Sequence, residues 1–169
     1  IAAEGANALY TGSIAADLVH TVATAERKPS DMTVADVAGY EAKERTPICA
    51  TYRAKRVCTI APPSSGGVSV LQTLAMIERF DMAALGPKSV AAYQAMAEAG
   101  RLALADREVY LADPDFFPVP MKELLTPSYL QARSKLIDPK GHMAAAPPGA
   151  LEVKKAMDLA PGIDRKTHV

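Results

Sequence analysis

Apolar residues recur three or four positions apart near the start of the chain, a spacing typical of an amphipathic helix. The apolar positions of this stretch are Ile14, Leu18, Val19 and Val22. They predict a helix over residues 11–27, because the Lys28–Pro29 step that follows disfavours helical backbone. We expect the apolar face of this helix to join the core. A shorter helix is predicted after Thr33, which can form a capping box with Asp36, and it is expected to end at Gly39.

Three further helices are predicted downstream. The apolar positions of residues 68–80 do not alternate with polar ones and continue too long for a strand. Residues 89–111 are predicted as a long helix that ends before Asp113–Pro114. The residues expected on its apolar side are Tyr93, Met96, Ala97, Gly100, Leu104 and Leu111. Residues 126–137 are predicted as the last helix, with a threonine as cap and a proline as first helical residue.

A β-hairpin is predicted between the first helices and the later ones. Residues 46–51 and 55–60 have strand character and are separated by a two-residue turn at Arg53–Ala54, although Ala54 stands where tight turns prefer glycine. In this register Cys49 faces Cys58. The two thiols could form a disulfide in an oxidising compartment, but we favour two small apolar residues on a shared sheet face.

Composition indicates one ordinary domain or a piece of one. The chain has 169 residues, of which 49% are hydrophobic, enough for a real core. Its 19 basic and 19 acidic residues cancel, so nothing indicates attraction to nucleic acid or to an anionic membrane. No stretch reaches the roughly 18 apolar residues of a membrane helix, so no membrane segment is expected. Because the first residue is isoleucine and not methionine, we expect the chain to begin inside a longer precursor.

The usual cofactor and metal signatures are missing from the sequence. It has no phosphate-binding glycine and lysine loop, no dinucleotide-binding glycine triplet, no helical zinc motif and no Cys-x-x-Cys pair. His20, His142 and His168 are far apart along the chain, so a metal site would need them to converge. We therefore expect no cofactor and no metal-binding residue.

The run of residues 62–67 changes from rigid to permissive backbone directly before a predicted helix. Ser64 and Ser65 could act as caps, as a nucleophile at a strand-to-helix turn, or as part of an anion site at a helix N-terminus. Pro63, however, stands where a nucleophile elbow needs its first glycine. We favour a structural cap and a close backbone crossing.

Four charged residues could form an acid pair or an oxygen-rich cation site: Asp106 beside Arg107, and Asp113 close to Asp115. Asp113–Pro114–Asp115 also has the composition of a turn, and charges along a helix usually pair with neighbours or face water. We favour this second interpretation. No catalytic residue is therefore assigned in this chain.

Two blocks, residues 62–74 (PPSSGGVSVLQTL) and 105–116 (ADREVYLADPDF), resemble the large subunit of the γ-glutamyltransferases, which are N-terminal-nucleophile hydrolases. Other segments resemble it in the same order over about residues 4–137. These segments are residues 8–15, 32–40, 45–47, 52–53, 124–129 and 132–133.

The resemblance implies a precursor that cuts itself, so that a threonine becomes the first residue of a small subunit and its α-amine activates its hydroxyl. This chain would be the C-terminal half of the large subunit: an α/β fragment, mostly helical with one β-hairpin, of a four-layer αββα fold. Residues 1–137 would form its core portion, and residues 138–169 an extended tail leading towards the autocleavage site. Its partner would be the small subunit of the same precursor. Alone, the chain is expected to be inactive and to expose apolar surface.

The implied activity is transfer or hydrolysis of γ-glutamyl groups from glutathione-like small molecules, without an added cofactor. The alternatives are a cephalosporin acylase of the same family and a non-catalytic scaffold with this fold. The resemblance also implies a periplasmic or secreted parent protein.

The end of the chain departs from the family's cleavage site, in which the nucleophilic threonine is followed by Thr-His. Here Thr167 directly precedes His168, and Lys166 stands in the nucleophile's place. Either the sequence departs from the family pattern at this point, or Thr167 belongs to the loop before a cleavage point that lies beyond Val169, and we favour the second interpretation. A lesser departure is Ala54, which replaces the glycine usual after Tyr-Arg.

Overall fold

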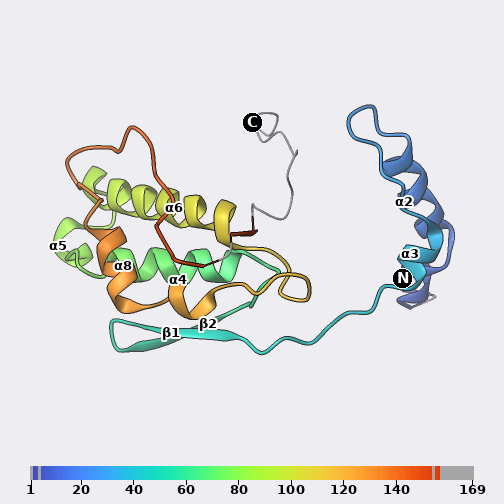
Figure 1. Ribbon diagram of the computed structural model, residues 1–169, viewed down its shortest axis with the longest axis horizontal. Helices are drawn as coiled ribbons and strands as arrows, with labels where there is room; N and C mark the ends of the chain where they lie inside the picture. Colours follow the sequence, from blue (N-terminus) through green and yellow to red (C-terminus); the bar gives the residue numbers. More distant parts are fainter. Residues whose placement is uncertain (1, 4, 154, 157–169) are drawn as a thin grey trace. The chain divides into compact units, whose positions relative to one another are not determined.

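The computed structural model describes residues 2, 3, 5–153, 155 and 156, and the chain divides into two compact units, Ile1–Glu44 and Arg45–Val169 (Figure 1). Composition alone indicated one domain or a piece of one. The division falls in the segment between the short capped helix and the hairpin, where residues 39–44 are exposed.

The first unit contains three helices: α1 (Asn7–Tyr10), α2 (Ser13–Ala23) and α3 (Val34–Ala38). The predicted capping box of α3 is confirmed. The Thr33 Oγ1 atom accepts from the Asp36 amide at 3.2 Å, and the Asp36 carboxylate accepts from the Thr33 amide at 2.8 Å. The hydroxyl of Thr33, followed by its backbone amide, holds the pKa of Asp36 below its ordinary value. Gly39 is the C-cap, as predicted.

The prediction for α2 was wrong in two respects. The helix ends four residues early, because the chain reverses and the Ser30 amide donates to the Val22 carbonyl at 2.9 Å, taking the acceptor that a further helical turn would use. Half of its expected core face is also exposed, with Ile14 at 40% and Leu18 at 42%, and Val19 and Val22 are only half-buried. The buried residue of α2 is Ala15, because a unit this small has little apolar surface to pack against.

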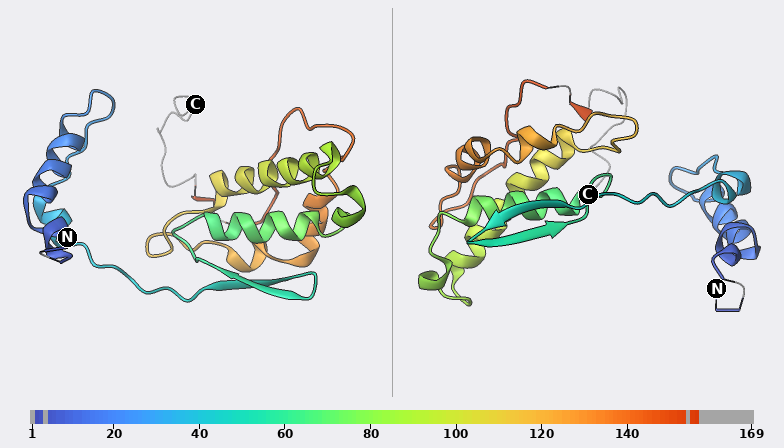
Figure 2. Two further views of the ribbon diagram at one scale, coloured as in Figure 1. Left: turned by 180° about the vertical axis from the view of Figure 1, so that it is seen from behind. Right: turned by 90° about the horizontal axis from the view of Figure 1, so that it is seen from below.

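The second unit places helices on a two-stranded hairpin (Figures 1 and 2). Its elements are β1 (Ile48–Tyr52), β2 (Lys55–Thr59), α4 (Gly66–Ile77), α5 (Met82–Leu85), α6 (Val90–Tyr110), α7 (Met121–Leu124) and α8 (Pro127–Ser134). Helix α4 is central, since it packs against α6, α8 and both strands. The described helices include none that is long and apolar enough to cross a membrane.

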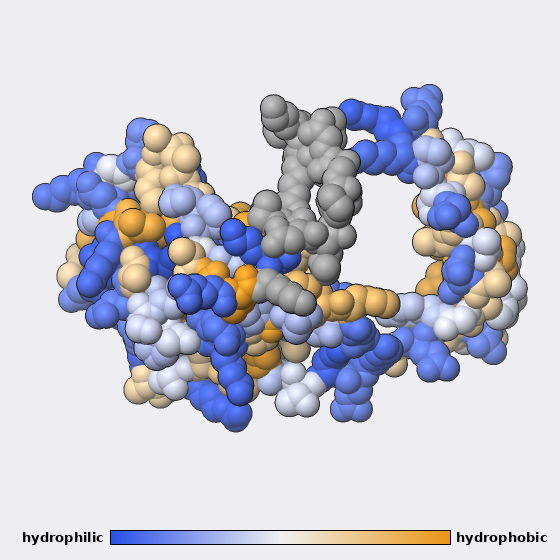
Figure 3. Space-filling model, viewed as in Figure 1, coloured by the Kyte–Doolittle hydropathy of each residue, from blue (hydrophilic) through white to orange (hydrophobic). Residues whose placement is uncertain are grey.

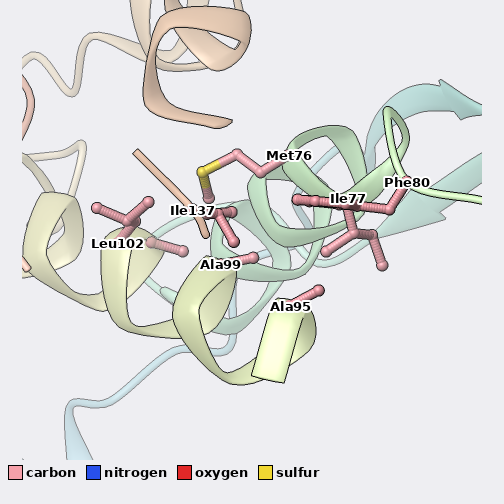
Figure 4. Close-up of a cluster of buried hydrophobic side chains, with 8 residues drawn as sticks. Met76, Ile77, Phe80, Ala95, Ala99, Leu102 and Ile137 are labelled. Carbon is pink, nitrogen blue, oxygen red and sulfur yellow. The ribbon is translucent and has the colours of Figure 1, made fainter. Parts of the chain in front are cut away.

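Large side chains of α4 pack against small ones of α6 to form the core (Figure 4). Met76 and Ile77 of α4, with Phe80 just beyond its end, cluster with Ala95 and Ala99, and alanines allow the two helix axes to approach closely. The remaining buried members of the cluster are Leu102, Ala103 and Ile137.

The predicted apolar side of α6 was wrong. Tyr93 is 60% exposed and Leu104 is 53% exposed, whereas the buried side carries mostly small residues. That buried side consists of Ala92, Ala95, Glu98, Ala99, Leu102, Ala103, Asp106, Val109 and Tyr110. Shape complementarity to α4 decides which side faces inward, and large apolar residues remain at the surface. Orange apolar residues are accordingly visible among blue polar ones in Figure 3.

The hairpin has the predicted register, with Cys49 opposite Cys58. Arg53 and Ala54 both have positive φ angles, as a two-residue hairpin turn requires. Our preference for a free cysteine pair was wrong, because the two cysteines form a disulfide. Directly facing positions bring side chains close enough for this bond.

For the turn before α4, the sequence predicted a structural cap and a close backbone crossing, and the structure confirms the second of these. A Cβ atom on Gly67 would overlap the Ile60 carbonyl oxygen, so the close backbone crossing is confirmed. The capping role is not, because Ser65 occupies the N-cap position without a side-chain cap bond.

Helix α6 begins as predicted after Ser89, whose side chain accepts from the Ala92 amide at 3.1 Å. Helices α4 and α8 begin near their predicted starts, but each ends three residues earlier than predicted. The short helices α1, α5 and α7 were not predicted, because four residues are too few to show a period.

Candidate functional site

The chain buries a carboxylate in the second unit, on the inner side of α6. Asp106 has 0% exposure and lies at helical spacing from Leu102, Val109 and Tyr110, which are also buried. A carboxylate removed from water is tolerated only when donors replace the lost hydration. The partners of Asp106 therefore show what this part of the fold is built to hold.

Donors from three places converge on Asp106. Its Oδ1 atom accepts from Arg133 Nη2 of α8 at 2.9 Å and from the Gly149 amide of the tail at 2.7 Å. Its Oδ2 atom accepts from the Tyr129 hydroxyl at 2.8 Å and from Gln72 Nε2 of α4 at 3.4 Å. The carboxylate thus ties α4, α6, α8 and the tail together.

The charged pair of Asp106 and Arg133 is buried on both sides, with side-chain exposures of 1% and 5%. Arg133 Nη2 also donates to the Leu102 carbonyl at 3.1 Å. Burial, followed by the hydrogen bond to the Asp106 carboxylate, raises the pKa of Tyr129 far above its ordinary value. The phenol is therefore a neutral donor at physiological pH.

The tail backbone is gripped around Gly149. The Tyr110 hydroxyl donates to the Gly149 carbonyl at 2.6 Å and accepts from the Leu151 amide at 3.1 Å. A Cβ atom at position 149 would overlap the Tyr129 hydroxyl, so a larger residue there would have to displace the Tyr129 side chain from its bond to Asp106. We call Asp106, Tyr110, Tyr129 and Arg133 the tail clamp.

The tail is also fixed upstream of the tail clamp. Gln94 Nε2 donates to the Gly141 carbonyl at 2.6 Å, and Arg101 Nη1 donates to the Met143 carbonyl at 2.8 Å. Glu98, which is buried, accepts from the Met143 amide at 3.3 Å. The described part of the predicted tail, up to residue 153, thus runs along α6 and is held there by hydrogen bonds with side chains of that helix.

The serine candidates do not form a catalytic set. The Ser65 Oγ atom accepts from Arg107 Nε at 2.8 Å, and Arg107 also pairs with Glu108. A serine nucleophile needs a proton acceptor beside it, whereas the partner of Ser65 is a donor. Ser64 follows the Pro62–Pro63 cis peptide bond in the same turn.

The acidic candidates are separated by the fold. Asp106 pairs with Arg133 and not with a neighbour on its helix, so the interpretation as a solvated or locally paired charge was wrong. Asp115 lies 2.8 Å and Asp113 lies 3.6 Å from Arg45 Nη2, and hydrogen bonding to Asp115 raises the pKa of Arg45. These two carboxylates therefore anchor the start of the second unit to the turn after α6.

Two of the three histidines lie in different units of the chain. His20 lies in the first unit and His142 in the second. Within the described part of the chain, no group of three or more His, Cys, Asp or Glu side chains could hold a metal ion. Lys166, Thr167 and His168 lie outside the described residues.

Most of the buried cluster could not be recognised from the sequence. Its members Tyr110, Tyr129, Arg133 and Gly149 come from three separate segments. One available signal was the position of Asp106 on the same helical side as Leu102 and Val109, where an acidic residue is unusual.

Comparison with known proteins places the chain in a family. A family model described as "Gamma-glutamyltranspeptidase" matches residues 1–168. The "Glutathione hydrolase proenzyme" of Escherichia coli is 41% identical over 138 residues, which cover 82% of this chain and 23% of that protein. The "Acylase ACY 1 proenzyme" of Pseudomonas sp. (strain SE83) is 38% identical, covering 82% of this chain and 24% of that protein.

Solved structures show the same relationship. The γ-glutamyltranspeptidase of Helicobacter pylori matches with a TM-score of 0.68 and 31% identity, covering 95% of this chain and 44% of that one. A cephalosporin acylase of Bacillus halodurans matches with a TM-score of 0.61 and 26% identity, covering 78% of this chain and 24% of that one. The helical unit with its hairpin is thus a fragment of the N-terminal-nucleophile hydrolase fold. The chain spans about a quarter of the length of the curated relatives named above, and it belongs to the gamma-glutamyltranspeptidase family.

Proposed function

We propose that this chain is the C-terminal half of the large subunit of a γ-glutamyltransferase or glutathione hydrolase. The observation that carries the proposal is the family match along residues 1–168, together with relatives named as glutathione hydrolase proenzymes. The chain supplies shape and support, because the hydrogen-bond partner of the Ser65 hydroxyl is a donor, and the buried charges of Asp106 and Arg133 pair with each other.

In this proposal the nucleophile is a threonine outside the chain, at the start of a small subunit released from the same precursor. The threonine attacks the γ-glutamyl carbonyl and displaces the amine, and water or another amine then takes the acyl group from the enzyme. Residues 1–137 form the core portion of the supporting half. Residues 138–169 are the tail that leads towards the cleavage point.

A second candidate is a cephalosporin acylase, which an acylase proenzyme at 38% identity supports nearly as well. The two functions share the scaffold and differ in the acyl group that the pocket accepts. A non-catalytic scaffold is the third possibility, and it predicts a parent protein that is never cut.

The test uses the intact parent protein, purified before and after maturation. We expect the single mass of the precursor to be replaced by the masses of two subunits, of which the smaller begins with threonine. We also expect the mature protein to release product from a γ-glutamyl anilide. Release from a cephalosporin amide alone would favour the acylase. A parent that stays uncut and hydrolyses neither substrate would contradict the proposal.

A further inference from the structure

We propose that the tail clamp is a positioning device for maturation: it fixes the register of the tail at Gly149, so that the chain beyond it reaches the cleavage point in one alignment. The inference rests on the proposed function, since it assumes a precursor that is cut downstream of this tail. The tail clamp comprises positioning residues, because none of its members is assigned to the reacting atoms.

The tail clamp binds the tail backbone on both sides of Gly149. The Asp106 carboxylate accepts from the Gly149 N–H. The Tyr110 hydroxyl donates to the Gly149 carbonyl and accepts from the Leu151 N–H. Leu151 and Val153 pack against a buried apolar cluster that includes Tyr110. The direction, position and side-chain register of the tail are therefore all specified.

The residues next to Gly149 disfavour the alignments of the tail that are shifted by one residue. A shift by one residue in one direction would present Pro148, which has no N–H to donate to Asp106. A shift in the other direction would present Ala150, whose Cβ would overlap the Tyr129 side chain and displace it from Asp106. The sequence Pro148–Gly149–Ala150 thus allows one alignment.

The stability of the fold alone does not require the buried charges of the tail clamp. A buried ion pair can often be replaced by apolar side chains of similar volume without loss of stability. In this chain the buried pair of Asp106 and Arg133 instead binds the backbone amide of Gly149, which lies 43 residues after Asp106. Intramolecular reactions depend steeply on the placement of the reacting groups, which gives a fixed register a clear use.

The experiment compares matched variants of the intact parent precursor. Gly149→Ala inserts a Cβ into the Tyr129 hydroxyl, and Tyr110→Phe removes the two tail bonds while keeping the ring. The controls are Gly100→Ala, where a Cβ meets nothing within 4 Å, and Tyr93→Phe at an exposed position of the same helix. Cleavage is followed by the appearance of the two subunits with time, and kcat is measured on the matured fraction.

We expect cleavage of both tail-clamp variants to slow by about tenfold or more, because a misplaced tail reaches the transition state less often. Both controls should mature at the wild-type rate. The matured fraction of each variant should keep kcat within about twofold of wild type, because the tail has then been cut. A role limited to supporting the fold would lower cleavage rate and kcat together, and that result would overturn the inference.

Cleavage of Tyr110→Phe at the control rate would also overturn it. If Gly149→Ala is insoluble, Tyr110→Phe decides, since it conserves volume and removes one oxygen atom. A wild-type precursor that is never cut would refute the proposed function and this inference together. Normal cutting of wild type and of both tail-clamp variants would refute the inference alone.

Discussion

Gly67 determines whether the chain can cross itself before α4. A side chain at this position would overlap the Ile60 carbonyl oxygen, which belongs to the backbone and cannot rotate away. Gly67→Ala must therefore displace either the start of α4 or the end of the hairpin. We expect a loss of roughly 1–3 kcal/mol in the free energy of unfolding, measured by denaturant titration.

Gly66→Ala is the matched control, because a Cβ there would lie 3.8 Å from the Ser64 hydroxyl oxygen, an ordinary contact distance. It should change stability little. Equal stability of the two variants would show that the crossing at Gly67 relaxes without cost.

Single residues were predictable where their partners are close in sequence. The capping box of Thr33 and Asp36 spans three residues, so the pattern alone predicted it. Asp106 was misjudged because its partners Arg133 and Gly149 lie 27 and 43 residues away. A local rule about charges on helices carries no information on such contacts.

At the scale of elements, the hairpin gives the clearest test. Its disulfide joins residues separated by 9 positions. A cross-link that closes a loop of this length lowers the entropy of the unfolded chain and so raises the free energy of unfolding by about 2–3 kcal/mol. We expect the Cys49→Ser/Cys58→Ser double variant to unfold at lower denaturant concentration by a corresponding amount. A reductant should destabilise the wild type and leave the double variant unchanged, and no effect on the wild type would contradict this account.

Helices were predicted well at their starts and less well at their ends and faces. Ser89 and Thr126–Pro127 mark starts by local chemistry, and the structure follows them. The end of α2 depends on a bond from Ser30 back to Val22, which no periodicity contains. The face of α6 depends on the bulk of Met76 and Phe80 across the interface, so the larger apolar residues of α6 were the wrong guide.

At the scale of the whole molecule, the sequence motifs predicted the family and the fold class, and the family match confirms both. The tail clamp could not be predicted, because its residues on α6 and α8 meet each other, Gln72 of α4 and Gly149 of the tail only in the folded chain. Composition of the tail indicated extension, whereas its anchoring depends on donors placed by α6 and α8.

The outer face of α6 gives a last prediction for the isolated chain. The exposed apolar residues of α6 are Val90, Tyr93, Met96, Ala97 and Leu104. Contiguous apolar surface binds hydrophobic dyes, whereas scattered apolar residues do so weakly. The Tyr93→Lys/Leu104→Lys variant should therefore lose most of the dye fluorescence. Val70→Lys/Phe116→Lys adds the same charge at exposed apolar positions outside this face, so it should retain most of the signal. Equal losses in the two variants would show that dye binding follows net charge and not the α6 face.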